Sequence, residues 1–227
     1  MTIPSDREAD PWCRGAVVRC VRFASFYVHC PSGEGEVCRQ ARSLCARLKE
    51  ANSRALPQFA AQVWWERMTD GRFAALFGRE VVLVPVPASC PRPSAAWVGA
   101  RLAWCLKEMG LARAVWPCLR RRYPVRKSAF APPGERPTVL EHYASFDVAA
   151  DRMGAGPAGR LVLVDDVITR GRTLLAAAAR LREAFPECEI VAFALMRTVG
   201  RGEVPSRNPD PCEGQVRWQR GDARRIP

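Results

Sequence analysis

Short apolar runs along the chain alternate with stretches in which apolar residues recur at helical spacing. Runs typical of buried strands lie at 17–23, 81–86, 113–119, 161–164 and 189–196. Helical spacing predicts helices over 36–52, 58–68, 94–109 and 173–185. This alternation predicts an α/β fold in which helices flank a parallel sheet.

The same pattern divides the chain into three parts. Residues 1–35 form an N-terminal segment, and 36–200 form the main domain. Within that domain, 120–153 has no strong period and three prolines inside 132–137, which predicts a long hood or lid excursion with some strand near 143–148. After residue 200 the chain has few apolar residues, so 201–227 is predicted to be a flexible basic tail.

Charge adds a preference for anionic ligands. The chain has 35 Lys and Arg against 23 Asp and Glu, a net charge of +12 at pH 7. That charge suits phosphate-rich small molecules and leaves weak binding of single-stranded nucleic acid open. An Arg-rich and Ala-rich composition is also what a GC-rich genome produces. Oligomerisation is equally open.

Ten cysteines are present, but the first residues show no basic and apolar leader, and no apolar run approaches the ~18 residues that span a bilayer. We therefore expect reduced thiols, a cytoplasmic protein and no membrane partner. Cys38 and Cys45 lie seven apart on a predicted helix, which is a core spacing. His29 and His142, the two histidines, have no partner at a recognisable spacing, so neither is assigned a role.

Two adjacent carboxylates, Asp165 and Asp166, directly follow the apolar run at 161–164. Burying such charges unpaired costs several kcal/mol as an order of magnitude. They are therefore expected at the exposed carboxyl end of the strand, where open α/β sheets bind ligands.

A loop suited to a phosphate group comes next. It supplies two hydroxyls, two guanidinium groups and one glycine just before a helix, from Thr169, Arg170, Gly171, Arg172 and Thr173. The first amides of a helix lack intrahelical partners and favour an anion. The glycine permits close backbone approach, and the second threonine can also cap the helix.

This stretch resembles the motif by which type I phosphoribosyltransferases bind 5-phosphoribosyl 1-pyrophosphate (PRPP). Three further segments are similar to the ComF family, and the likeness covers about residues 40–200. These segments are Val84-Pro85-Val86-Pro87, Leu48-Lys49 with Ala55-Leu56, and Ala144-Ser145-Phe146-Asp147-Val148.

The resemblance implies a phosphoribosyltransferase-like fold with a small N-terminal or hood region, and a set of ligand contacts. Asp165 and Asp166 would hold the ribose hydroxyls, directly or through Mg²⁺, and 169–173 would hold the 5-phosphate. The loop of Pro87, Ala88 and Ser89 would face pyrophosphate, with the basic stretch 120–127 as added charge or a lid. The cofactor would be Mg²⁺, the co-substrate PRPP and the acceptor an unknown nitrogen.

A second hypothesis follows from residues 88–93, which replace the run that the family carries after its Pro-Val-Pro loop. In that case the chain binds PRPP or a nucleotide without transfer, or associates with single-stranded DNA during DNA uptake.

Overall fold

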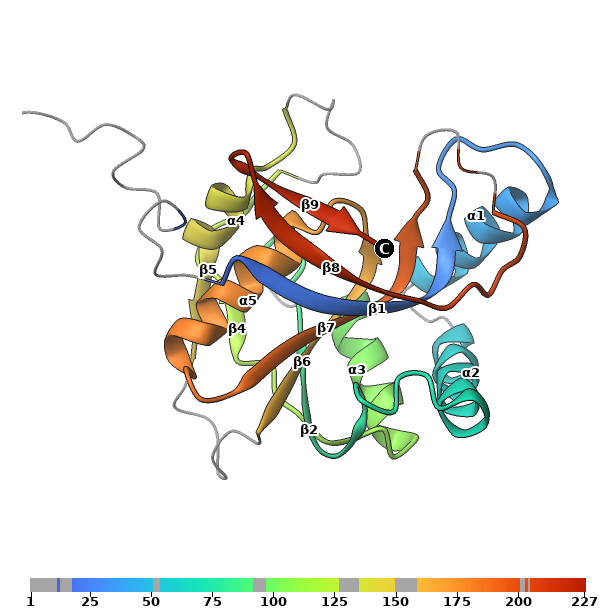
Figure 1. Ribbon diagram of the computed structural model, residues 1–227, viewed down its shortest axis with the longest axis horizontal. Coiled ribbons are helices and arrows are strands. Elements are labelled where there is room, and N and C mark those ends of the chain that lie inside the picture. The colour runs from blue at the N-terminus through green and yellow to red at the C-terminus, as the bar shows by residue number, and fades with distance from the viewer. Residues whose placement is uncertain are drawn as a thin grey trace, which may run out of the picture.

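The computed structural model describes residues 12, 18–50, 54–91, 97–126, 135–149, 159–200, 203 and 205–227. These residues form an α/β fold with a mixed, mostly parallel sheet of seven strands flanked by five helices (Figure 1). The predicted α/β class is therefore confirmed.

The main sheet has the order β3-β2-β6-β7-β1-β8-β9. Its parallel strands are β3 (Ala112–Val115), β2 (Gly78–Pro85), β6 (Arg160–Ile168), β7 (Glu189–Thr198) and β1 (Cys20–His29). Two antiparallel strands, β8 (Cys212–Gln219) and β9 (Asp222–Ile226), extend the sheet beyond β1. A second sheet pairs β4 (Leu119–Arg121) with β5 (Phe146–Val148).

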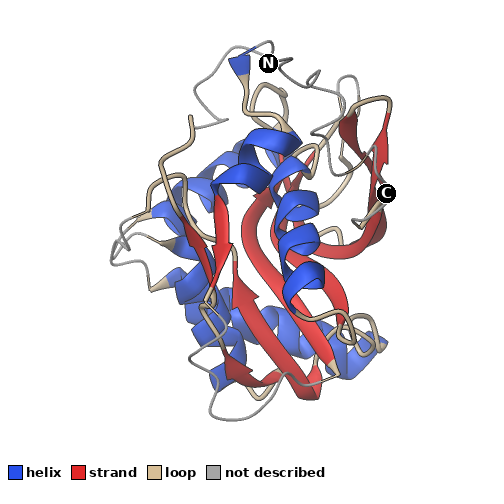
Figure 2. Ribbon diagram, turned by 90° about the vertical axis from the view of Figure 1, so that its left-hand side faces the viewer, coloured by secondary structure: helices blue, strands red, loops and turns tan. Residues whose placement is uncertain are grey.

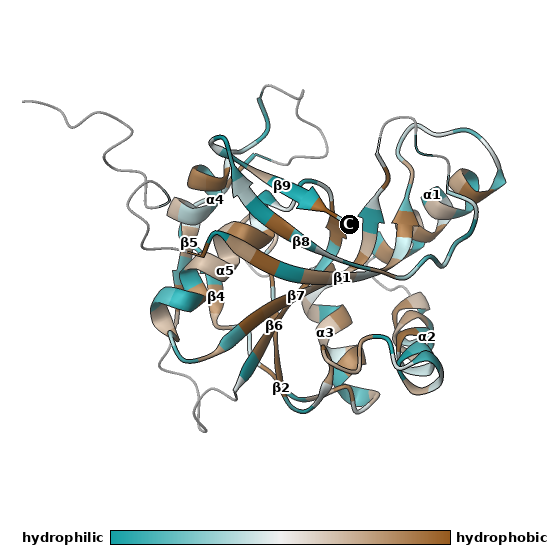
Figure 3. Cartoon of the chain, in the orientation of Figure 1, coloured by the Kyte–Doolittle hydropathy of each residue, from teal (hydrophilic) through white to brown (hydrophobic). Residues whose placement is uncertain are grey.

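Helices cover both faces of the main sheet, as Figure 2 shows. One face carries α1 (Glu36–Lys49), α2 (Ala55–Asp70) and α3 (Val98–Glu108), and the other carries α4 (Val139–Ser145) and α5 (Arg172–Ala184). Neighbouring residues of one strand pack on opposite faces: Leu161 and Leu163 join the core beneath α5, whereas Val162 and Val164 join the core beneath α3. The central strands are accordingly apolar along most of their length (Figure 3).

Most predicted elements agree with the structure. The helices predicted at 36–52 and 173–185 are α1 and α5, and the strands at 81–86 and 189–196 are β2 and β7. The predicted helix at 58–68 begins earlier, at Ala55, because Pro57 fits the first helical turn, where no intrahelical N–H is needed. Ser94, the predicted start of a further helix, lies outside the described residues, and α3 begins at Val98.

The hood region contains more regular structure than its sequence suggests. The run at 113–119 splits into β3 and β4, which belong to different sheets. Helix α4 is not predicted, although Thr138 and Glu141 form a capping box at its start: each side chain accepts the other's backbone N–H, at 3.1 and 2.6 Å.

Both ends of the described chain correct the sequence interpretation. Of the apolar run at 17–23, residues 20–23 belong to β1, which continues to His29 and lies inside the main sheet between β7 and β8, whereas residue 17 lies outside the described residues. The prediction of a flexible tail is wrong for 212–226, which form the β8–β9 hairpin. An antiparallel edge can leave one face to solvent, so Val216 and Ala223, both buried, are sufficient apolar anchors.

No helix in the described parts of the chain is both long and apolar enough to cross a membrane.

Candidate functional site

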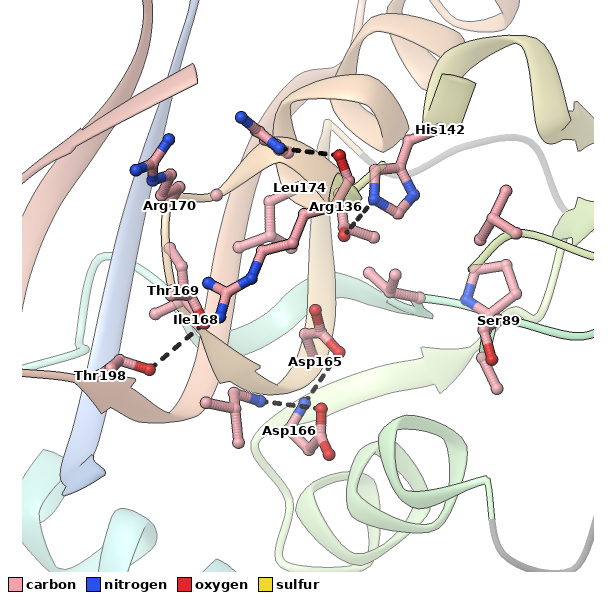
Figure 4. Close-up of a pocket in the computed structure, with 18 of the residues that line it drawn as sticks. Ser89, Arg136, His142, Asp165, Asp166, Ile168, Thr169, Arg170, Leu174 and Thr198 are labelled. Carbon is pink, nitrogen blue, oxygen red and sulfur yellow. Dashed lines mark hydrogen bonds between the residues drawn. The ribbon is translucent and has the colours of Figure 1, made fainter. Parts of the chain in front are cut away.

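The carboxyl ends of β2, β6, β7 and β1 open into a pocket of about 670 Å³. The residues singled out from the sequence all line it: Pro87, Ala88, Ser89, Asp165, Asp166, Thr169, Arg170, Gly171, Arg172 and Thr173. Arg126, from the basic stretch 120–127, also lines the pocket, whereas Lys127 lies outside the described residues. Segments distant in the sequence therefore share one cavity (Figure 4).

The two carboxylates lie inside β6, not after it as expected from the apolar run. Pairing with β2 ends at Val164, whereas pairing with β7 continues to Ile168. Asp165 and Asp166 therefore lie in the part of β6 that no longer pairs with β2, and both line the pocket on that side. One oxygen of each carboxylate accepts the next residue's backbone N–H, at 3.0 Å for Asp165 and 2.9 Å for Asp166 (Figure 4).

Asp165 is half-buried, and its pKa is raised well above the ordinary aspartate value. Loss of hydration is the largest cause, and the charge of Asp166 adds to it, whereas the positive charge of Arg121 opposes the rise. A cation bound by the two carboxylates would favour their ionised forms, so it would offset both the lost hydration of Asp165 and the charge of Asp166.

Carboxylates in this arrangement fit Mg²⁺ only as part of a larger set of ligands. Among the described residues, no three His, Cys, Asp or Glu side chains gather to hold a metal ion. Mg²⁺ is usually bound by one or two carboxylates together with water and substrate phosphates. The donors present therefore fit Mg²⁺ that arrives with a phosphorylated substrate.

Gly171 forms the turn from β6 into α5. It is the N-cap residue with φ of 85°, a left-handed conformation that favours glycine. An added Cβ would lie 2.4 Å from Cγ2 of Val216 on β8, so no side chain fits there. The first amide that bonds back is that of Leu175, to the Gly171 carbonyl at 2.9 Å. The amides of residues 172–174 therefore form the free N-terminal end of the helix.

The two arginines of this loop have different environments. The Arg172 fork bonds both oxygens of Asp222 on β9, at 2.7 and 2.6 Å, and also donates to the carbonyls of Arg136 and Pro137. Its guanidinium group thus fixes the loop, contrary to the expectation that both guanidinium groups serve an anion. The Arg170 side chain is 60% exposed, and its contact with Asp222 is longer, at 3.4 Å.

Thr173 contacts the hood instead of capping its own helix, which corrects the capping prediction. Nε2 of His142 lies 3.4 Å from the Thr173 hydroxyl, and Nδ1 of His142 lies 3.0 Å from an Arg121 nitrogen. Because arginine only donates, Nδ1 must accept, and the proton of a neutral ring is on Nε2. His142 then donates to Thr173, whose own proton is left to point at a ligand.

Arg121 joins the same network to the loop of β2. This buried side chain donates to the Ala88 carbonyl at 3.2 Å and lies 3.8 Å over the Phe146 ring. Burial lowers its pKa to about 10, so it remains a cation at neutral pH. Through Arg121 and His142, the loop of Ala88 is connected to Thr173 across the pocket.

No local pattern in the sequence marks His29, Lys49, His142 and Thr198 as lining residues, whereas Arg121 belongs to the basic stretch 120–127 that was expected there. They stand at the ends of separate elements or, for His142, within helix α4 of the hood. Both histidines, which were assigned no role, therefore belong to the pocket. Only the order of the strands brings these side chains together, and single-sequence patterns do not give that order.

Replacing His142 by asparagine tests this network through pH. Burial, with the charges of Arg121 and Arg172, lowers the pKa of folded His142 from 6.5 to about 3, so the fold prefers the neutral ring. The stabilisation it gives is complete above pH 6.5 and is lost as pH falls toward 3. We expect the stability advantage of the wild type over His142→Asn to shrink by about 2 kcal/mol between pH 7 and 4.

Urea unfolding at both pH values measures this difference. Asparagine keeps an oxygen near the position of Nδ1 for Arg121, so loss of that contact does not dominate. An advantage independent of pH would contradict a neutral, buried His142.

No protein-family model and no curated protein matches the sequence. The pocket places two carboxylates beside a helix N-terminus and surrounds them with basic side chains.

Proposed function

We propose that the protein is a phosphoribosyltransferase-type enzyme that binds PRPP with Mg²⁺ and transfers its phosphoribosyl group to a nitrogen acceptor. One observation carries the proposal: paired carboxylates at the end of β6 and the free amides at the start of α5 line the same pocket. A sugar phosphate matches this pair, because its hydroxyls suit the carboxylates and its phosphate suits the amides.

In this proposal the 5-phosphate is bound by the first turn of α5. The amides of residues 172–174 provide backbone donors, the hydroxyls of Thr169 and Thr173 provide side-chain donors, and Arg170 provides charge. The fixed fork of Arg172 keeps the loop open before the ligand arrives. Preorganised donors of this kind cost little to order on binding.

Mg²⁺ would be held by Asp165 and Asp166 together with substrate oxygens, and it would supply charge that stabilises the departing pyrophosphate. The side chain of Arg121, which donates to the Ala88 carbonyl, adds positive charge there. Arg126 lines the same pocket, but its guanidinium group forms a salt bridge with Glu135 at 2.7 Å. Transfer forms a bond from nitrogen to the anomeric carbon as that carbon's bond to oxygen breaks. The bonding electron pair leaves with pyrophosphate, and an acceptor nitrogen that carries a proton releases it to solvent, whereas one without a proton becomes a cation.

Calorimetry with PRPP tests the proposal directly. We expect PRPP to bind in the presence of Mg²⁺ and at least about 10-fold more weakly in EDTA, since a divalent cation bound together with the ligand is worth several kcal/mol of charge stabilisation. Ribose 5-phosphate should bind too, because it keeps the phosphate and the hydroxyls. Wild-type protein that binds neither ligand would contradict the proposal.

Release of pyrophosphate decides whether transfer occurs. Ammonia, amines and nucleobases are offered with PRPP, and turnover with any of them supports the enzyme. Ligand binding without turnover would favour the second hypothesis, a PRPP-binding or nucleotide-binding protein.

The basic lining of the pocket could also bind single-stranded DNA, and this second role has its own test. Apart from Asp165 and Asp166, the charged residues that line it are basic. If this lining binds DNA through phosphates, the logarithm of the affinity falls linearly with the logarithm of salt concentration. An affinity that does not change with salt would contradict that role.

A further inference from the structure

One wall of the pocket takes no part in the proposed binding of PRPP. It is formed by His29 at the end of β1, Lys49 at the end of α1 and Thr198 at the end of β7, all of which line the cavity. The elements that carry them lie far apart in the sequence and meet only because β1 is the neighbour of β7.

The position of this wall follows from the order of the strands. β2, which leads into the loop of Ala88 and Ser89, borders β6 on one side, whereas β7 and then β1 follow on the other. In Figure 4, Ser89 and Thr198 accordingly lie on opposite sides of Asp165 and Asp166. A ribose held by the two carboxylates would therefore have one anomeric face toward each loop.

Displacement at an anomeric carbon brings the nucleophile to the face opposite the leaving group. With pyrophosphate on the side of Ser89, a nitrogen acceptor has to approach from the side of Thr198. On that side the acceptor would contact the wall of His29, Lys49 and Thr198.

The polarity of this wall limits what it can bind. Nδ1 of His29 lies 3.3 Å from the Thr198 hydroxyl, and this hydroxyl lies 3.3 Å from that of Thr169. The pKa of His29 is lowered by burial and by the charge of Lys49, so the ring is neutral at pH 7. Lys49 is exposed and forms no salt bridge with a carboxylate among the described residues. The wall therefore offers neutral hydrogen-bonding groups and one positive charge that forms no salt bridge with a described carboxylate.

We infer that this wall is the acceptor subsite and that it selects a nitrogen nucleophile that carries a carboxylate. The inference depends on the proposed function and adds the class of acceptor to it. The carboxylate would pair with Lys49, and the neutral groups of His29 and Thr198 would hydrogen-bond the rest of the acceptor. A cationic acceptor would be repelled by Lys49, and a neutral one would leave that charge unmatched.

The test uses acceptors in pairs that differ by one carboxylate: aniline with 2-aminobenzoate, uracil with uracil-6-carboxylate, and pyridine with pyridine-3-carboxylate. Each is offered to the protein saturated with PRPP and Mg²⁺, and both binding and pyrophosphate release are measured. We expect the carboxylate member of at least one pair to be favoured about 10-fold or more, as close charge pairs in partly desolvated sites can provide.

Lys49→Met removes the positive charge and should reduce this preference to about two-fold or less. Lys49→Arg keeps the charge and should therefore keep most of the preference. Lys107→Met is the matched control, because Lys107 pairs with Glu108 on α3 and does not line the pocket. This control should leave the preference unchanged.

Three results would overturn the inference: no pair in which the carboxylate member is favoured, a preference that survives Lys49→Met, or a Lys49→Met variant that loses more affinity for PRPP than for the acceptor. Each of them is compatible with PRPP binding by the wild type. Absence of that binding would instead contradict the proposed function itself.

Discussion

Asparagine in place of Asp165 is expected to stabilise the free protein while strongly lowering its affinity for PRPP. Burial and the charge of Asp166 raise the pKa of Asp165, so the ionised carboxylate is a cost to the folded state at neutral pH. The amide keeps the oxygen that accepts the Asp166 amide and removes this charge. A gain of about 1 kcal/mol, or roughly 2–4 °C in melting temperature, is expected in EDTA.

The same change removes one of the two anionic ligands offered to Mg²⁺ and to the ribose hydroxyls. We expect the affinity for PRPP with Mg²⁺ to fall on the order of 100-fold, the scale of one lost hydrogen bond to a charged group. Thermal unfolding and calorimetry on the same samples measure both effects. Opposite changes in stability and binding are what distinguish a functional carboxylate from a structural one.

Asp147→Asn is the control for this experiment. Asp147 forms a salt bridge with Arg122 at the surface, at 2.8 Å, and does not line the pocket. Its replacement should leave PRPP binding unchanged and should not stabilise the protein, because it breaks that pair. If Asp165→Asn bound PRPP like the wild type, or were the less stable protein in EDTA, the assignment of Asp165 would be wrong.

Alanine in place of Gly171 is expected to have the second large effect. The residue has φ of 85°, and its added Cβ would approach Cγ2 and Cγ1 of Val216 to 2.4 and 2.7 Å. The left-handed conformation alone costs about 1–2 kcal/mol, and relief of the clash must move the loop or β8. We expect PRPP affinity to fall about 100-fold, because the donors of the first α5 turn then lose their alignment.

Gly71→Ala is the control that separates the cost of a left-handed backbone from the effect of a clash that moves the loop. Gly71 has φ of 66°, and its added Cβ would meet nothing within 4 Å, so this variant has the conformational cost without the clash. It should lower stability by about 1 kcal/mol and leave binding unchanged. The double variant Gly171→Ala with Val216→Ala should recover part of the binding, since the removed methyls make the closest contacts. Normal binding by Gly171→Ala alone would show that the loop is not the phosphate site.

The sequence predicted the parts of the fold that have strong local periods. The apolar run before Asp165 and the Ala-rich and Leu-rich helix after Gly171 are continuous in the chain, so their patterns are complete in one window. The hairpin of 212–226 was not predicted, because one buried valine and one buried alanine anchor a largely polar ribbon against β1. Edge strands of this kind have little apolar pattern to detect.

The candidate site likewise has residues that the sequence predicted and residues that it did not. Asp165 and the loop 169–173 lie next to one another in the chain, and their residue types suggest the chemistry. His142 could not be found by spacing, and Arg121 was expected only as part of the basic stretch 120–127, because their contacts depend on the fold of the hood over the pocket. The role of Arg172 was misread because its partner, Asp222, lies 50 residues further along.

The β8–β9 hairpin packs against the loop 169–173 and holds it in place. Val216 packs on Gly171, Asp222 receives the fork of Arg172, and Arg225 donates to the carbonyls of Ile168 and Thr198. During synthesis, β6 and α5 leave the ribosome well before residues 212–226 do, and domains fold as units as the chain emerges. A nascent chain can therefore contain the whole segment from Asp165 to Thr173 and still lack the contacts that hold it in place, so the pocket is completed only after β8 and β9 have emerged.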